Sequence, residues 1–230
     1  MSAEMVGGID LNEAFGETNE YANRVVFPES YYVGTLNIQE VGNQENEKQT
    51  PFAKVEFTIA EGPFAGQSIQ DKLYLTPGAK GGGLGLFLGA TKAITGQSAN
   101  IPAIAAKYGI ALPVYGGGDM KEFRQDLRRS FAEQFAMLDA DKKLSSMLEL
   151  FNVKQWDGKK IVVKVEIDQQ EAKEPDPVTG IKKVFIKNQL RGFFGQGDTA
   201  RGLGYVRSTA HKKQQEDREA MINAGQPVSA

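Results

Sequence analysis

The stretch PFAKVEFTIAEGPFAGQSIQDKLYL, residues 51–75, holds two runs in which apolar and polar side chains alternate. An alternation with period two is typical of β-strands that bury one face. Between the runs, Gly62, Pro63 and Gly66 favour a tight reversal of the chain. The positions expected to face the core are Ala53, Val55, Phe57 and Ile59 in the first run and Ile69, Leu73 and Leu75 in the second. The stretch therefore predicts an antiparallel hairpin.

Three further segments show the same alternation. YYVGTLNIQEV (residues 31–41) precedes the hairpin, whereas KKIVVKVEID (residues 159–168) and IKKVFIKNQLRGFF (residues 181–194) follow it. After Pro77 the spacing of the apolar residues changes to that of one helix face. The residues on this face are Leu84, Phe87, Leu88, Thr91 and Ile94. The predicted order is therefore three strands, a helix and two strands.

A long segment, residues 97–149, separates the predicted helix from the fourth strand. We expect it to be largely helical, with a short helix near residues 101–108. The longest helix should begin at Asp119, where Glu122 completes a capping pattern. LSSMLELF, residues 144–151, predicts another short helix. The segment is thus an insertion with its own helices.

Composition excludes several classes of function. The chain has no cysteine and a single histidine, His211 in a polar stretch, so we expect no metal site and no cofactor. No apolar run approaches the ~20 residues of a membrane span. The formal net charge is -2, yet residues 1–30 hold six acidic residues and one basic residue, which leaves 26 of the 27 basic and 23 of the 29 acidic residues in the rest. A mildly basic body therefore follows an acidic leader.

The order of three meandering strands, a helix and a hairpin is that of the OB-fold, a five-stranded Greek-key barrel. Residues 31–96 and 150–194 also resemble phage-type single-stranded-DNA-binding proteins with this fold. In that family a strand ending in EG-x-(Y/F)-x-G leads into the third strand, and a W-x-G-K turn opens the fourth. The matching residues here are EGPFAG (61–66) and WDGK (156–159). The uncharged end INAGQPVSA differs from the acidic tail common in such proteins.

Order and resemblance together predict a mainly β fold with an OB-fold barrel in residues 29–194 and a helical insertion at about 97–150. Residues 1–28 are expected to form a flexible acidic leader and residues 195–230 a flexible tail. The resemblance implies a non-catalytic protein that coats single-stranded DNA with little sequence preference during phage replication or recombination. Its expected partners are single-stranded DNA and replication or recombination proteins, and oligomer formation stays open. A cytoplasmic location, in the host cell if phage-encoded, is expected, because the first residues lack a secretion signal.

The outward positions of the predicted strands mix lysines with aromatic residues. Such a mixture suits single strands, because cationic groups follow the phosphates while rings stack on bases. The candidate DNA-binding residues are Lys54, Lys72, Tyr74, Lys164, Phe185, Lys187 and Arg191, with Phe52 and Tyr31, which each begin a strand, and Lys80 as further candidates. Lys121, Arg124 and Arg128 share one side of the longest predicted helix and could extend the basic track. The alternative is a solvated surface for each lysine, and packing under a loop or the insertion for Tyr74 and Phe185.

Other functions stay open beside this hypothesis. A structural or protein-interaction β-barrel module of a virion or replisome is the first alternative. A magnesium-dependent nuclease would need converging carboxylates, for which the sequence offers Asp71, Asp157, Glu166 and Asp168. Asp157 reads as a turn residue, and Glu166 and Asp168 read as surface strand positions. Because catalytic motifs and a histidine in the folded part are also missing, we do not expect an enzyme. The glycine-rich GAKGGGLG, residues 78–85, lacks the G-x-x-x-x-G-K-(S/T) pattern of a phosphate-binding loop and predicts a joint into the helix.

Overall fold

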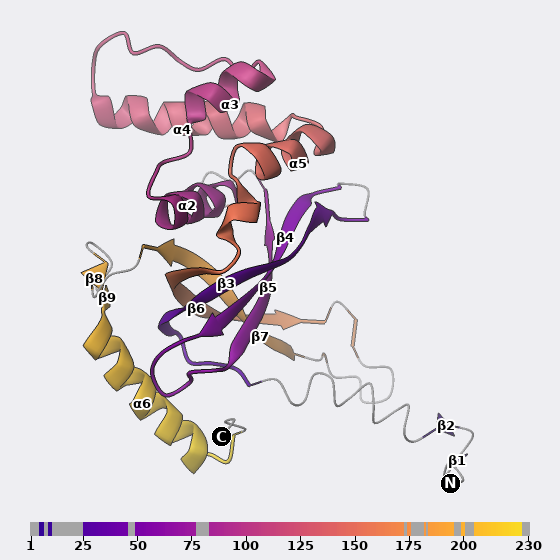
Figure 1. Cartoon of the computed structure of the whole chain (residues 1–230). Coiled ribbons are helices and arrows are strands. Elements are labelled where there is room, and N and C mark those ends of the chain that lie inside the picture. Colours follow the sequence, from indigo (N-terminus) through magenta and orange to yellow (C-terminus); the bar gives the residue numbers. More distant parts are fainter. Residues whose placement is uncertain are drawn as a thin grey trace.

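The computed structural model describes residues 5–6, 9–10, 25–45, 49–76, 83–172, 174–175, 182, 184–195, 199–200 and 205–226. Its elements in chain order are β1 (Met5–Val6), β2 (Ile9–Asp10), β3 (Ser30–Asn43), β4 (Pro51–Ile59), β5 (Ser68–Tyr74), α2 (Gly83–Thr95), α3 (Ile101–Tyr108), α4 (Met120–Ala136), α5 (Ala140–Glu149), the 3-10 helix η1 (Val153–Trp156), β6 (Lys159–Glu171), β7 (Val184–Phe194), β8 (Thr199–Ala200), β9 (Tyr205–Val206) and α6 (Arg207–Asn223). Figure 1 shows a central sheet with helices at one end and along one side.

The five long strands form one antiparallel sheet in the order β5-β4-β3-β6-β7. β3 is central, because it pairs with β4 through residues 34–43 and with β6 through residues 30–36. The five strands, the helix after the third and the helical insertion before the fourth agree with the sequence prediction. The predicted closed barrel is not seen, since no backbone ladder joins the edge strands β5 and β7 within the described residues. Helices α2 to α6 cover more residues than these strands, so the fold is mixed α/β and not mainly β.

The inner face of the sheet carries the apolar positions that the alternation predicts. Those positions, all at most 4% exposed, are Ala53, Val55, Phe57, Ile59, Ile69, Leu73 and Leu75. α2 covers one end of this core, and its Phe87 ring lies 5.4 Å from the ring of Trp156, centroid to centroid. Trp156 is fully buried and donates from Nε1 to the Phe151 carbonyl at 3.2 Å. The turn before β6 is thereby fixed to the core.

Helices α3, α4 and α5 form the insertion, and Figure 1 shows α3 and α4 beyond α2, away from the sheet. α4 begins where expected, because Asp119 accepts a hydrogen bond from a backbone N–H of the first turn. Phe131 and Phe135, in its C-terminal half, are buried, whereas Phe123 and Leu127 are half-exposed. α4 has 17 residues, as has α6, so it is not longer than every other helix as predicted. The first half of α4 therefore projects from the body of the protein.

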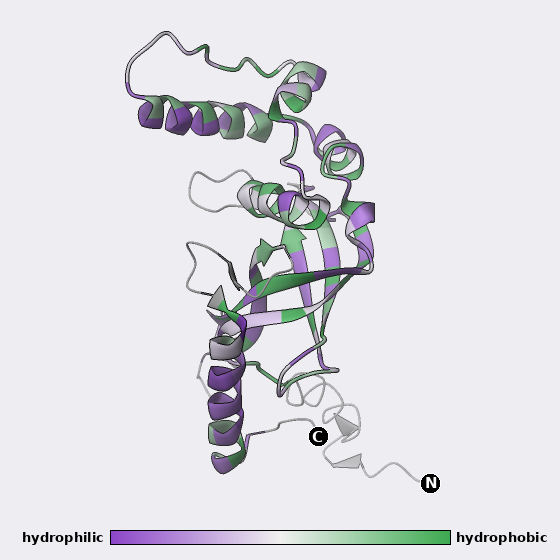
Figure 2. Cartoon of the chain, turned by 60° about the vertical axis from the view of Figure 1, so that its left-hand side comes forward, coloured by the Kyte–Doolittle hydropathy of each residue, from purple (hydrophilic) through white to green (hydrophobic). Residues whose placement is uncertain are grey.

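The C-terminal segment contains helix α6, where the sequence predicts a flexible tail. Ala210 is buried against Val33 and Val162 on the outer face of β3 and β6. The Gln214 side chain donates to the Tyr31 carbonyl at 2.6 Å. Figure 2 shows α6 almost entirely in hydrophilic colours. An apolar pattern does not reveal this helix, because its contacts come from Ala210, from the partly buried Met221 and from polar hydrogen bonds.

The chain is also fixed to the sheet just before β3, inside the predicted leader. Phe27 is 3% exposed, and its backbone N–H and carbonyl bond the side chain of Asn188 on β7, each at 2.8 Å. Residues 11–24 of that leader lie outside the described part of the structure. The side-chain amide of Asn188 thus bonds both the N–H and the carbonyl of one distant residue, Phe27. A hydropathy pattern does not reveal such a long-range polar contact.

Candidate nucleic-acid interface

Four of the predicted DNA-binding residues lie together on the outer face of β4 and β5. Phe52 pairs with Tyr74 across the two strands, and Lys54 pairs with Lys72. All four alternate with buried positions and therefore share one face of the sheet. We call these four residues the β4–β5 patch.

The aromatic half of the patch is more covered than the sequence suggests. Phe52 is 5% exposed, whereas an outward and accessible ring was expected, and Tyr74 is half-buried. Their ring centroids are 6.1 Å apart, and Lys72 Nζ lies 4.7 Å from the centroid of the Phe52 ring. Gly42 lies opposite Phe52 on β3, and a Cβ built at Gly42 would meet the Phe52 ring at an ordinary 3.8 Å. Tyr74 is thus the more accessible of the two rings, and the buried Phe52 ring packs against it.

The lysine half of the patch sets two ammonium groups at directly opposite positions. Like charges that face each other across antiparallel strands destabilise a sheet. Neither Lys54 nor Lys72 forms an ion pair with a described acidic side chain, although Glu40 lies opposite Lys54 on β3. The patch therefore carries positive charge that the described neighbouring side chains leave without an ion pair.

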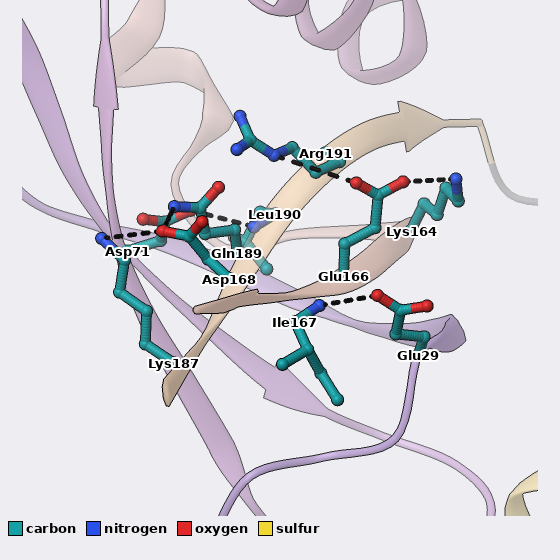
Figure 3. A network of polar contacts seen from close by, with 10 residues as sticks. All are labelled: Glu29, Asp71, Lys164, Glu166, Ile167, Asp168, Lys187, Gln189, Leu190 and Arg191. Atoms are coloured by element: carbon teal, nitrogen blue, oxygen red, sulfur yellow. Dashed lines mark hydrogen bonds and ion pairs between the residues drawn. The ribbon is translucent and has the colours of Figure 1, made fainter. Parts of the chain in front are cut away.

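The predicted cations of β6 and β7 are instead paired with carboxylates (Figure 3). Lys164 binds Glu166, Lys187 Nζ lies 3.9 Å from Asp168 Oδ2, and Arg191 Nε lies 4.0 Å from Glu166 Oε2. The hydrogen bond that Lys164 donates to Glu166 raises the pKa of Lys164, as expected for a stabilised cation. This side of the sheet carries much less uncompensated charge than its basic residues indicate.

The carboxylates of this network were not recognised as partners from the sequence. The sequence nonetheless shows opposite charges at the outward positions of the two strands. These positions are Lys164, Glu166 and Asp168 on β6 and Lys187, Gln189 and Arg191 on β7. Opposite charges at outward positions of neighbouring strands indicate cross-strand pairs once the register is known. Gln189 completes the set by donating to Asp168 Oδ2 at 2.6 Å.

Asp71 bridges the two edge strands. Its Oδ2 accepts a hydrogen bond from the backbone N–H of Leu190 on β7 at 2.9 Å, and its Oδ1 accepts one from the backbone N–H of Lys72 at 2.8 Å. Burial raises the pKa of Asp71, although these hydrogen bonds and the charges of Lys187 and Arg191 act in the opposite direction. β5 and β7 are therefore joined by a side chain in place of a backbone ladder.

We expect Asp71→Ala to lower the free energy of unfolding by about 1–3 kcal/mol, because the Leu190 N–H loses its acceptor. Asp71→Asn keeps one acceptor oxygen and removes the charge, so its free energy of unfolding should fall by less than that of Asp71→Ala. The pKa of Asp71 is raised in the folded state, so ionisation of this carboxyl lowers the stability of the protein. As the pH falls through this pKa, the free energy of unfolding of the wild type should therefore rise relative to that of the Asn variant. Urea titrations at several pH values measure both effects, and an alanine variant as stable as the wild type would contradict the bridge.

The remaining predicted residues are dispersed. Tyr31 is half-buried beside α6, with its ring centroid 5.8 Å from that of Phe194. β7 includes Phe185, but the side chain of Phe185 lies outside the described part of the structure, as does the whole of Lys80. Three basic residues are exposed on one side of α4, namely Lys121, Arg124 and Arg128. The structure thus gathers four of the ten strand and loop candidates into one patch.

Comparison with protein-family models and with curated proteins finds no match to the chain. Among the described residues, no group of three or more His, Cys, Asp or Glu side chains is placed to hold a metal ion. None of the described helices is both long and apolar enough to cross a membrane. The β4–β5 patch offers two ammonium groups and an accessible phenol ring, which together suit a ligand with phosphates and flat bases.

Proposed function

We propose that the protein binds single-stranded DNA on the β4–β5 patch and coats it during replication or recombination, without catalysis and with little sequence preference. The observation that carries this proposal is the placement of Lys54 directly opposite Lys72, beside Tyr74. Two like charges at facing positions weaken the sheet. A phosphate between them removes this repulsion, while the phenol ring offers a surface on which a base stacks.

We further propose that the sheet is a partly open OB-fold barrel. In support, β3 to β7 follow the strand order of that fold, with the first strand between the second and the fourth and a helix after the third. The remaining contact of the barrel, between the third and fifth strands, is where Asp71 meets the backbone of Leu190. The second and third strands of an OB-fold carry its binding face. Here these are β4 and β5, which carry the patch.

The basic side of α4 extends the proposed track. Lys121, Arg124 and Arg128 are spaced to lie on one side of the helix, whereas Asp126 pairs with Arg129 at 2.6 Å on another. α5, which follows α4, contacts β4. The insertion therefore meets this strand through α5, whereas the three basic residues lie in the first half of α4, which projects from the body of the protein (Figure 1).

The proposed function is tested by fluorescence anisotropy of labelled oligonucleotides. We expect single strands to bind more tightly than duplex at low salt, with log affinity falling against log salt by about 0.7 per phosphate contacted. A label on the strand is needed, because Trp156 is fully buried and cannot stack on bases. An RNA strand of the same sequence supplies the third arm. Absence of binding to single strands at low ionic strength would contradict the proposal.

A protein-interaction module of a virion or replisome is the second candidate, favoured by apolar side chains exposed on the insertion. Val114 is 91% exposed and Met137 83% exposed, and Tyr115 and Met120 are also exposed. Scattered apolar residues are common on surfaces, whereas a contiguous group marks a contact site. A stable complex with a replication or structural protein, together with no binding to DNA at low salt, would favour this candidate over the first.

A further inference from the structure

α6 and the sheet form a half-open pocket near the start of β3, and the proposed function does not use this pocket. Its volume is about 320 Å³, which lies within the usual range for small-ligand sites. Its walls come from the beginning of β3, the middle of β6 and the first turns of α6. The pocket exists because α6 packs against the sheet, so its presence could not be inferred from the strand pattern.

Two lysines line this pocket, Lys164 on β6 and Lys213 on α6. Lys164 binds Glu166, and Lys213 Nζ donates to the backbone carbonyl of Glu29 at 3.1 Å. An ammonium has three donor hydrogens, so each lysine keeps donors for a ligand. The Glu29 carboxylate also lines the pocket, but its Oε1 accepts from the backbone N–H of Ile167 at 3.1 Å. The lining residues thus carry two cations against one carboxylate, and Glu166, outside the lining, binds one of the two cations, Lys164.

The rest of the lining is aromatic and apolar. Tyr31 contributes its ring, which the contact with Phe194 holds in place. Val206, at the start of α6, is 43% exposed and lines the same space. A flat, partly apolar group can lie between such side chains, while an anion attached to it reaches the lysines. Neither a bare anion nor an uncharged ring would use both parts of the lining.

We propose that this pocket binds a nucleoside monophosphate group, supplied either as a free nucleotide or as the phosphorylated end of a strand. Its phosphate contacts Lys164 and Lys213, and its base lies against Tyr31. The site is separate from the β4–β5 patch, because the patch pairs with residues 40–42 of β3 and the pocket includes residues 30–31. At ~3.4 Å per residue this is a separation of roughly 30 Å along the strand.

Isothermal titration calorimetry of the full chain with deoxyadenosine monophosphate tests the proposal. Lys213→Ala should weaken binding about tenfold or more, since a charged hydrogen bond is lost. Lys213→Arg keeps the charge and should keep most of the affinity, which separates ligand contact from damage to α6. Lys212→Ala is the matched control, because Lys212 does not line the pocket and lies 3.9 Å from Glu216 on the same helix.

The source of the ligand is distinguished by eight-residue thymidine strands with and without a 5′ phosphate. Tighter binding of the phosphorylated strand, lost in Lys213→Ala, assigns the strand end, whereas binding of the mononucleotide alone assigns the free ligand. Equal affinity of Lys212→Ala and Lys213→Ala, or a mononucleotide that binds no better than inorganic phosphate or deoxyadenosine, would overturn the proposal. Lys72→Ala should leave mononucleotide binding unchanged. The proposal for the pocket and the proposal for the β4–β5 patch can therefore be contradicted independently.

Discussion

Reversal of both patch lysines, Lys54→Glu with Lys72→Glu, is expected to lower the affinity for single-stranded DNA by about 100-fold or more at low salt. Each ammonium that bonds a phosphate contributes roughly 1.5–3 kcal/mol, and each glutamate adds repulsion. The slope of log affinity against log salt should also fall in magnitude, by about 0.7 for each phosphate contact removed. Anisotropy titrations of the two proteins against one labelled strand measure both quantities.

A second double variant, Lys92→Glu with Lys212→Glu, controls for net charge. It changes the charge of the protein by the same amount at exposed positions on α2 and α6, away from the patch. We expect this control to lose much less affinity, because exposed charges farther than a Debye length of about 10 Å from the strand are screened. Equal losses in the two double variants would show that general charge, and not the patch, binds the strand.

Stability should change in the opposite direction from affinity. Lys72→Glu alone replaces two facing like charges by an opposite pair, because position 72 lies directly across from Lys54. Such a cross-strand pair contributes roughly 0.2–1 kcal/mol, so the free energy of unfolding should rise while DNA binding weakens. Urea denaturation detects this gain. A single variant that is less stable than the wild type would show that Lys72 serves the fold, through its contact with the Phe52 ring.

The inner face of the sheet could be predicted from the sequence, because burial imposes a period of two that hydropathy records directly. Phe57 and Leu73 face the core, and the helix containing Phe87 covers it, as the patterns indicate. α3 was also predictable. The start of α4 was predictable because Asp119 caps that helix. These features depend on residues that are near one another in the sequence.

The outer face could be predicted only in part, because its properties depend on register and on distant segments. Arg191 meets Glu166, and Lys187 meets Asp168, only because β6 pairs with β7, and this pairing has a register shift beside Lys164. Phe52 is covered because Tyr74 and Lys72, on the neighbouring strand, lie against its ring. α6 reaches the sheet through Gln214, a polar side chain that no hydropathy pattern marks as buried. The candidate site therefore includes fewer residues than the lysines and aromatic residues of the sequence suggest.

A large effect on stability is expected when one methyl group is added at Gly34, in β3. A Cβ built there would lie 2.3 Å from the carbonyl oxygen of Thr58 and 2.6 Å from Cζ of Phe57. One contact is with backbone and the other with a fully buried ring, so neither neighbour can move without opening the pairing of β3 with β4. Close approach of two strands over a packed ring is what requires glycine at this position.

Gly34→Ala is accordingly expected to lower the free energy of unfolding by about 3 kcal/mol or more, the upper end of the range for overpacking. Gly42→Ala is the matched control, since it lies on the same strand and its added Cβ would meet its nearest neighbour, a Phe52 ring carbon, at an ordinary 3.8 Å. Adding Phe57→Leu should recover only part of the loss, because the contact with the Thr58 carbonyl remains. Urea titrations compare the variants. If Gly34→Ala were as stable as Gly42→Ala, the close approach of β3 to β4 would not limit the fold.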